Sequence, residues 1–246
     1  MTVTVKVSNL TGGYGHQPVI HHIDFELLPG QIVGLIGLNG AGKSTTIKNM
    51  LGLLRPLEGE IEINGYQLSK APFEYRAQLS YIPESPVLYD ELTLEEHIDM
   101  TAMAYNIDAN TAMERAMPLL KIFRLESKLK QFPAHFSKGM KQKVMIICAF
   151  ISEPALHIID EPFLGLDPLG IQSMLDLMVQ ARDANRTVLM STHILTTAEL
   201  YCDSFLLLHH GKLIGKGTIE DLRAQFNMPN ASLDEIYIHA TGDVHG

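Results

Sequence analysis

The sequence predicts an α/β fold with a mainly parallel sheet core, an antiparallel β subdomain and a helical subdomain. Three patterns support this class. Polar and apolar residues alternate near the N-terminus, buried-strand patterns alternate with helical patterns around residues 31–54 and 156–192, and the interval 88–152 has helical periodicity. The chain has 246 residues, 46% of them apolar, which is enough for a full core.

The first third of the chain is expected to be mixed β with one helix. The alternating apolar positions of its first strands are Val3, Val5, Val7, Ile23, Phe25 and Leu27. A buried strand at 31–37 precedes a helix from about Lys43 to Leu54, which Arg55-Pro56 ends. The dipeptide Asn64-Gly65 then predicts a β-hairpin.

The later patterns are helical and then alternate with strands. Thr93 and Glu96 have capping-box spacing, and Ser137 stands at the N-cap position of an apolar helix. The segments 156–160 and 187–192 are typical of buried strands, and the helical pattern between them indicates a parallel sheet.

No repeat or linker divides the chain, so we expect a single domain over 1–246. The core with its antiparallel β part is expected to comprise 1–85 and 153–228, the helical subdomain about 86–152, and a C-terminal tail 229–246.

Composition argues against several functions. The formal net charge of −9 disfavours a protein that coats nucleic acid, because such proteins need basic surfaces. The longest apolar run is 144–151, shorter than the roughly 18 to 20 residues of a membrane span. Two cysteines without a CxxC pattern favour a reducing compartment. The paired histidines lie on strand-like segments, where neighbouring side chains diverge, so we expect no metal other than Mg²⁺.

Residues 37–44, GLNGAGKS, fit the phosphate-binding P-loop pattern GxxxxGK[ST]. They follow a buried strand and open a helix, which is the context that this motif requires. Main-chain N–H groups of such a loop surround phosphate oxygens, while Lys43 and a Mg²⁺ held by Ser44 oppose their charge. A plain glycine turn is the alternative.

Acidic residues at the end of a later strand complete the expected site. Asp160 ends the strand 156–160, and Glu161 follows at once. Because parallel strand ends gather at one crevice, we expect Asp160 near the metal and Glu161 near the γ-phosphate as a general base. His193, after the next strand, is a candidate donor to the γ-phosphate or water. The alternative is that the Asp-Glu-Pro segment only caps the following helix.

Six motifs in order make the chain similar to the nucleotide-binding subunit of an ABC transporter over nearly its full length. The signature motif LSGGQ corresponds to residues 136–140, FSKGM, and the D-loop to 165–167. The resemblance implies Mg²⁺ and ATP as cofactors. It assigns to ATP the residues Tyr14, Gly37, Asn39, Gly40, Ala41, Gly42, Lys43, Ser44, Thr45, Ser137, Lys138 and Gly139. Lys43, Glu161 and His193 are the implied catalytic residues.

Two departures from the family pattern matter. Glu84 replaces the usual Gln, and SGGQ has become SKGM. We predict Ser44, Asp160 and Glu84 as metal-proximal residues, with a solvent-facing hinge as the alternative for Glu84. Several segments resemble the ATPase subunits of Ecs-type transporters of Gram-positive bacteria, for which peptide handling or protein secretion is the implied process.

The resemblance implies a cytoplasmic ATPase, peripheral at the inner face of the cell membrane, that works as a head-to-tail homodimer. Its implied partner is a polytopic membrane permease subunit (EcsB-like), and no nucleic acid is expected. Residues 89–97 are either a solvated helix start or part of the groove for that permease. The alternative function is a soluble ABC ATPase acting on ribosomes or DNA.

Overall fold

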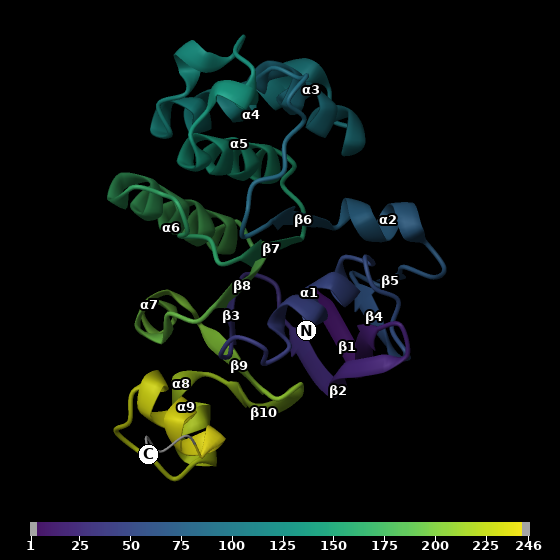
Figure 1. Ribbon diagram of the computed structural model, residues 1–246, viewed down its shortest axis with the longest axis vertical. Helices are drawn as coiled ribbons and strands as arrows, with labels where there is room; N and C mark the ends of the chain where they lie inside the picture. Colours follow the sequence, from purple (N-terminus) through teal and green to yellow (C-terminus); the bar gives the residue numbers. More distant parts are fainter. Residues whose placement is uncertain (1–3, 243–246) are drawn as a thin grey trace.

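A six-stranded sheet runs through the middle of the molecule, as the computed structural model shows for residues 4–242 (Figure 1). Its strand order is β10-β9-β3-β8-β7-β6, and all neighbours are parallel except the edge pair β9 and β10. The strands are β3 (Ile32–Ile36), β6 (Leu79–Ile82), β7 (Leu156–Asp160), β8 (Thr187–Thr192), β9 (Ser204–His209) and β10 (Lys212–Gly217). The predicted parallel core is confirmed.

An antiparallel sheet in the order β2-β1-β4-β5 packs beside this core. Its strands are β1 (Val5–Tyr14), β2 (Gln17–Leu27), β4 (Glu58–Ile63) and β5 (Tyr66–Gln67). Asn64 and Gly65 have φ of 47° and 82°, so they form the predicted tight hairpin turn. The predicted strand residue Val3 lies outside the described residues.

The helix after the P-loop is shorter than the sequence predicts. Helix α1 (Lys43–Met50) ends four residues before Leu54, because Gly52 adopts a φ of 71° and the Leu53 N–H bonds back to the Lys48 carbonyl at 2.9 Å. The first third also contains a second helix, α2 (Pro72–Ala77), whereas the sequence predicted only one helix there. Only one of its six residues, Tyr75, is buried, so it has almost no apolar stripe.

Three further helices form a layer at one end of the molecule (Figure 1). They are α3 (Leu94–Ala104), α4 (Ala109–Ile122) and α5 (Lys138–Ile151), with the short 3₁₀ turns η1 (Glu126–Lys128) and η2 (Pro133–His135) between α4 and α5. The predicted capping box of Thr93 and Glu96 is present at α3. Ser137 caps α5, its hydroxyl accepting a hydrogen bond from the Met140 N–H at 3.2 Å.

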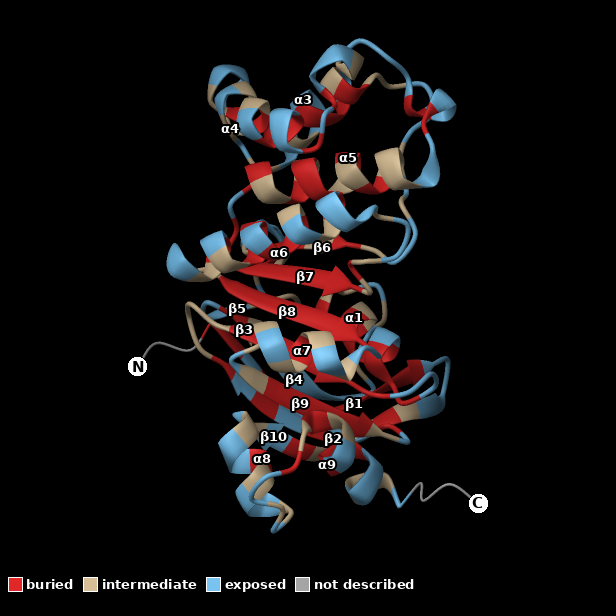
Figure 2. Cartoon of the chain, turned by 90° about the vertical axis from the view of Figure 1, so that its left-hand side faces the viewer, coloured by how far each residue is buried: buried red, intermediate tan, exposed pale blue. Residues whose placement is uncertain are grey.

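The remaining helices cover the other parts of the sheet. They are α6 (Pro168–Asp183), α7 (Leu195–Tyr201), α8 (Ile219–Gln225) and α9 (Leu233–Thr241). Figure 2 shows that the central strands are buried while the helices expose one side. Strand β3 divides two apolar cores, since Ile32 and Ile36 pack on the helical side and Val33 and Leu35 pack toward the antiparallel sheet. None of the helices within residues 4–242 is long and apolar enough to cross a membrane.

Candidate functional site

The P-loop wraps a small cavity at the carboxyl end of β3. Gly42 has a φ of 110°, and a Cβ there would lie 2.7 Å from the Ile20 side chain, so only glycine fits. The buried Lys43 ammonium donates to the Gly37 carbonyl at 2.5 Å, while Ser44 is exposed. A cavity of about 130 Å³ is lined by Val19, Leu38, Asn39, Gly40, Gly42, Lys43, Ser44 and Thr45. The loop therefore offers a lysine, a hydroxyl and main-chain N–H groups to one space.

The two acidic residues after β7 lie in different environments. Strand register pairs Asp160 with Ser191, and Asp160 is 8% exposed and accepts a hydrogen bond from the Ser191 hydroxyl. Glu161 has a φ of 47°, which takes it out of the strand path, and its Oε1 lies 2.8 Å from Nδ1 of His193. The carboxylate of Glu161 is 12% exposed and the imidazole of His193 is 51% exposed.

Electrostatics link these groups to the P-loop. Burial lowers the pKa of Lys43, and the nearby carboxylates of Glu161, Asp160 and Glu84 oppose this shift. Burial, together with the charges of Asp160 and Glu84, raises the pKa of Tyr81 to about 12. Glu84 is exposed, two residues after the end of β6. In the folded chain, three carboxylates therefore lie close enough to the buried Lys43 to interact with its charge.

Tyr14 lies at the end of β1, next to the helix that follows the P-loop. Half of its surface is exposed, and its hydroxyl accepts a hydrogen bond from the Lys48 ammonium at 3.1 Å. That contact lowers the pKa of Tyr14. Because Lys48 is on α1, directly after the P-loop, an exposed aromatic ring stands beside the phosphate-type cradle.

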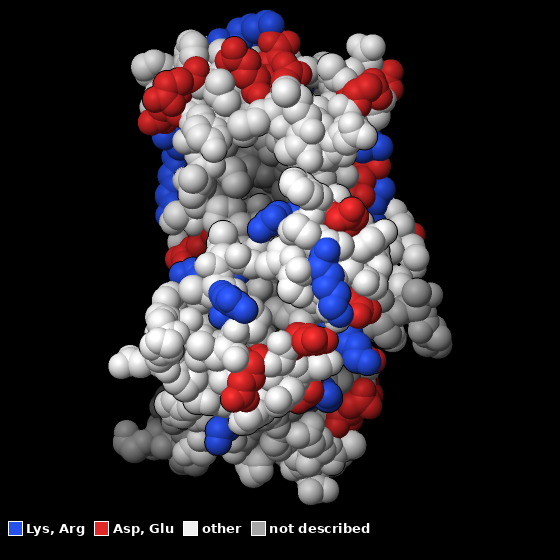
Figure 3. All heavy atoms as spheres, turned by 90° about the vertical axis from the view of Figure 1, so that its right-hand side faces the viewer, with Lys and Arg blue, Asp and Glu red and all other residues white. Residues whose placement is uncertain are grey.

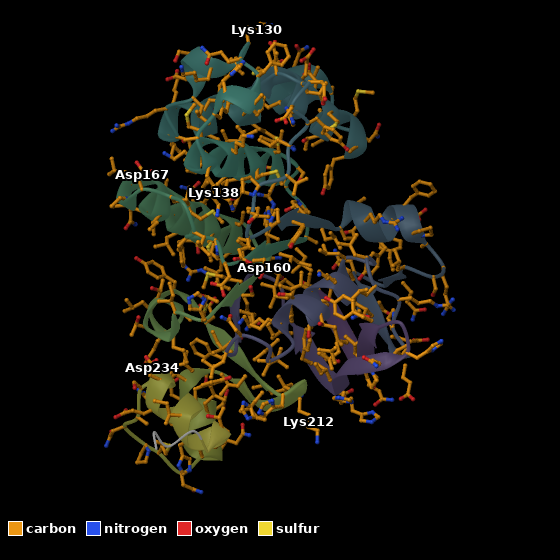
Figure 4. The ribbon with its side chains drawn as sticks, viewed as in Figure 1. Lys130, Lys138, Asp160, Asp167, Lys212 and Asp234 are labelled. Atoms are coloured by element: carbon orange, nitrogen blue, oxygen red, sulfur yellow. The ribbon has the colours of Figure 1, made fainter. Side chains whose placement is uncertain are left out.

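The predicted signature residues stand apart from the P-loop. Ser137, Lys138 and Gly139 open α5, and no hydrogen bond or ion pair in the described part of the chain joins them to residues 37–45. Figure 4 shows Lys138 and Asp167 toward the same side of the molecule, with Asp160 farther inside. One protomer therefore does not bring all the predicted ATP residues together.

The lysines at the start of α5 divide into paired and unpaired residues. Lys143 forms an ion pair with Asp167 at 2.8 Å, and Lys141 forms a longer one with Asp90 at 3.7 Å. Lys138 is exposed, and its stem lies over Gly165, where an added Cβ would be 3.7 Å from Lys138 Cγ. Of the three lysines, Lys138 alone forms no ion pair with an acidic residue in the described part of the chain.

The donor set suits Mg²⁺. Within residues 4–242 no cluster of three or more His, Cys, Asp or Glu side chains could enclose a metal ion. Mg²⁺ does not need such an enclosure, because it keeps several waters and is held by one or two carboxylates together with substrate phosphates. Asp160 and the exposed Ser44 hydroxyl offer the oxygen ligands that this ion prefers.

Two residues near the site were not predicted from the sequence as site residues. Ser191 holds Asp160, and strand register could have signalled that contact. Tyr237 on α9 reaches the P-loop residue Leu38. No local pattern signals this second contact, since it joins positions 199 residues apart.

Comparisons with known proteins agree with this geometry. Residues 20–164 match the ABC transporter family. The chain is 58% identical to "ABC-type transporter ATP-binding protein EcsA" of Bacillus subtilis (strain 168), over 98% of both chains. It is 36% identical to "Bacitracin transport ATP-binding protein BcrA" of Bacillus licheniformis, over 91% of this chain and 72% of that protein.

A solved structure of the ATP binding subunit of an ABC transporter has the same fold as this chain. The two superpose with a TM-score of 0.94 at 56% sequence identity, over 96% of this chain and 99% of the other. Family match, full-length identity and fold all agree. The chain therefore belongs to the ABC transporter family, as an ATP-binding subunit that hydrolyses ATP.

Proposed function

We propose that the crevice between the P-loop and the ends of β7 and β8 binds Mg-ATP and hydrolyses it to drive a separate membrane subunit. The 2.8 Å contact between Glu161 and His193, beside the buried Lys43, carries this proposal. Tyr14 would stack on the adenine, and residues 37–45 would surround the phosphates.

Each side chain has a distinct part in the proposed reaction. Ser44, Asp160 and Glu84 would hold Mg²⁺, which supplies positive charge to the phosphate oxygens. Lys43 would leave the Gly37 carbonyl for the phosphates. Glu161 would accept a proton from the attacking water while the bond from the γ-phosphorus to the ADP oxygen breaks, giving ADP and phosphate. His193 would orient Glu161 and contact the γ-phosphate.

A Glu161→Gln variant tests the general base. The amide keeps the size of the side chain but cannot accept the proton, so we expect ATP hydrolysis to fall by about 100-fold or more while ATP affinity stays within about twofold. Glu126→Gln on the exposed η1 is the matched control. Hydrolysis above half of the wild-type rate in Glu161→Gln would contradict this role.

We further propose that two copies close head to tail around two ATP molecules. Supporting this, Ser137, Lys138 and Gly139 stand at the N-terminus of α5, where the first main-chain N–H groups have no carbonyl partner within the helix. The γ-phosphate held by a partner's P-loop is the anion that such a helix start suits.

The proposed membrane partner is an EcsB-like polytopic permease, which would hold this chain at the inner face of the cell membrane. Figure 3 shows a hollow on the face that carries α2 and the outer end of α3, with few charged side chains around its centre. Exposed apolar residues on α2, in the loop before α3 and at the end of α3 are Phe73, Val87, Tyr89 and Met103. A short amphipathic helix from the permease is the occupant that this surface suits. Peptide handling or protein secretion is the proposed process.

Co-purification from membranes tests the partner. We expect a co-expressed EcsB-like permease to be recovered with the tagged wild-type chain and to be lost when Phe73 and Met103, which are 84% and 82% exposed, both become Asp. Leu200→Asp, at an equally exposed position on α7, is the control. Recovery of ribosomes or DNA in place of the permease would support the alternative of a soluble ABC ATPase.

A further inference from the structure

The hydroxyl of Tyr237 joins the first turn of the P-loop to the neighbouring strand β9. The side chain belongs to α9 and is 3% exposed. The Leu38 N–H donates to its oxygen at 3.1 Å, and the hydroxyl donates in turn to the Leu208 carbonyl at 3.0 Å. One hydroxyl therefore satisfies a main-chain donor of the P-loop and a main-chain acceptor of β9.

The position of this hydroxyl follows from where the sheet pairing stops. Strands β3 and β9 pair in parallel as far as Ile36 and Leu207. The two chains remain close beyond that point, since a Cβ on Gly37 would lie 2.8 Å from the Leu208 carbonyl oxygen. Tyr237 inserts there and continues the connection between the chains. Without it, the part-buried Leu38 N–H and the buried Leu208 carbonyl would lose this partner, which is unfavourable where water cannot fully replace it.

Helix α9 is itself firmly anchored. Ser232 and Glu235 form a capping box, and the Leu233 N–H donates to the Glu199 carboxylate at 2.9 Å. Leu233 and Ile236 are fully buried. Glu199 lies on α7, the helix that begins two residues after His193. The tail thus spans from the segment after His193 to the start of the P-loop.

We infer that Tyr237 is a positioning residue for ATP binding, which acts by holding the P-loop in the shape that fits phosphates. Its hydroxyl contacts the main chain of Leu38, a residue that lines the P-loop cavity, but Tyr237 itself does not line that cavity. A P-loop that samples other shapes binds ATP in proportion to its competent fraction, which weakens apparent affinity and leaves the chemical step unchanged. This inference rests on the proposed ATP site.

A Tyr237→Phe variant removes only the oxygen. We expect the Kd for ATP, measured by calorimetry with Mg²⁺ present, to rise about five- to tenfold while kcat stays within about twofold. Hydrogen exchange of the Leu38 amide should become at least about tenfold faster. Tyr105→Phe is the matched control, because it removes a hydroxyl that donates to the Leu79 carbonyl at 2.7 Å, away from the P-loop. The control should lose thermal stability without losing ATP affinity.

The outcomes separate this inference from the function on which it rests. Wild-type affinity in Tyr237→Phe would overturn the positioning role, even if its Tm fell as in Tyr105→Phe. Failure of the wild-type chain to bind ATP would instead overturn the proposed site. If Tyr237→Phe does not fold, Glu199→Ala decides, since it loosens α9 from outside the core. A rise of about two- to threefold in the Kd for ATP would support the role, and an unchanged Kd would overturn it.

Discussion

Asp160 and Glu161 are adjacent in sequence, yet the fold gives them different surroundings. In a regular strand their side chains would point to opposite faces. The φ of 47° at Glu161 ends the strand abruptly and turns that carboxylate toward His193, while Asp160 stays buried against Ser191. A non-glycine residue in this conformation is uncommon and costs about 1 kcal/mol or more. The strained conformation at Glu161 therefore lets two carboxylates that are adjacent in sequence both belong to the site.

His157 is a buried titratable group that the proposed reaction does not use. It is 1% exposed, stacks on Phe150 with ring centroids 4.6 Å apart, and places Nδ1 2.8 Å from the Ser80 hydroxyl. Its Nε2 is buried without a hydrogen-bond partner. Burial, followed by the charge of Arg186, lowers the pKa of His157 from 6.5 to about 3.

This lowered pKa predicts acid destabilisation between pH 6.5 and 3. In that window the unfolded chain binds a proton at His157 that the folded chain does not, so the free energy of unfolding falls as pH falls. The expected loss by pH 5 is about 2 kcal/mol. Urea unfolding at pH 7.5 and pH 5 should show this loss in wild type, and His157→Gln should remove it.

The matched control for that experiment is His135→Gln, which replaces an exposed histidine on η2. It should keep the wild-type difference between the two pH values. An equal acid loss in His157→Gln and wild type would show that other groups cause it.

The start of α5 and the D-loop, residues 165–167, form a single packed unit. A Cβ on Gly139 would lie 2.5 Å from the Gly165 carbonyl oxygen, so helix and loop are in direct contact. Four residues along the helix, Lys143 pairs with Asp167 and holds the pKa of that carboxyl below its usual range. Because the D-loop begins four residues after Glu161, the position of α5 is mechanically connected to the proposed general base.

Breaking the Lys143 ion pair should slow turnover more than it weakens ATP binding. For Lys143→Met we expect kcat for ATP hydrolysis to fall about three- to tenfold, with KM within about twofold, because the D-loop loses its fixed position. Lys143→Arg should keep more than half of the wild-type rate. Lys141→Met, which removes the longer pair with Asp90, is the control. Equal rates in the two methionine variants would argue against the connection.

Strong local patterns were sufficient for much of the fold. The parallel core, the Asn64-Gly65 hairpin and the caps at Thr93 and Ser137 each have a local physical signal. The predicted end of α1 was wrong, because the left-handed Gly52 that ends the helix gives no periodic signal. The short α2 was not predicted, because an almost uniformly exposed helix has no apolar stripe. The sequence also grouped the P-loop with the carboxylates, whereas the contact from Tyr237 depends on packing between distant segments.

The distribution of the predicted ATP residues over the molecule has a structural consequence. Residues 37–45 and the carboxylates lie together, whereas Ser137, Lys138 and Gly139 open a helix in a different layer (Figure 1). A head-to-tail pair would bring the helix start of one copy to the P-loop of the other. Binding of ATP by one chain and closure of the pair are then separable steps.

A Gly139→Asp variant should separate these steps. A carboxylate at the second position of α5 would add negative charge to the helix start that we propose meets the partner's γ-phosphate, and like charges there oppose closure. We expect the Kd for ATP of the single chain to stay within about twofold, while ATP-dependent dimerisation is lost and hydrolysis falls by about 50-fold or more. Light scattering after gel filtration with ATP, in a Glu161→Gln background, measures the dimer.

Two controls assign the cause of that loss. Gly139→Ala adds the Cβ that meets the Gly165 carbonyl without adding charge, so the difference between Ala and Asp isolates the electrostatic part. Ala134→Asp adds one negative charge on the exposed surface of η2, just before the helix, and should leave the dimer intact. A dimer that still forms in Gly139→Asp would contradict the head-to-tail arrangement. Loss of ATP binding by the single chain would instead show that the start of α5 acts within its own protomer.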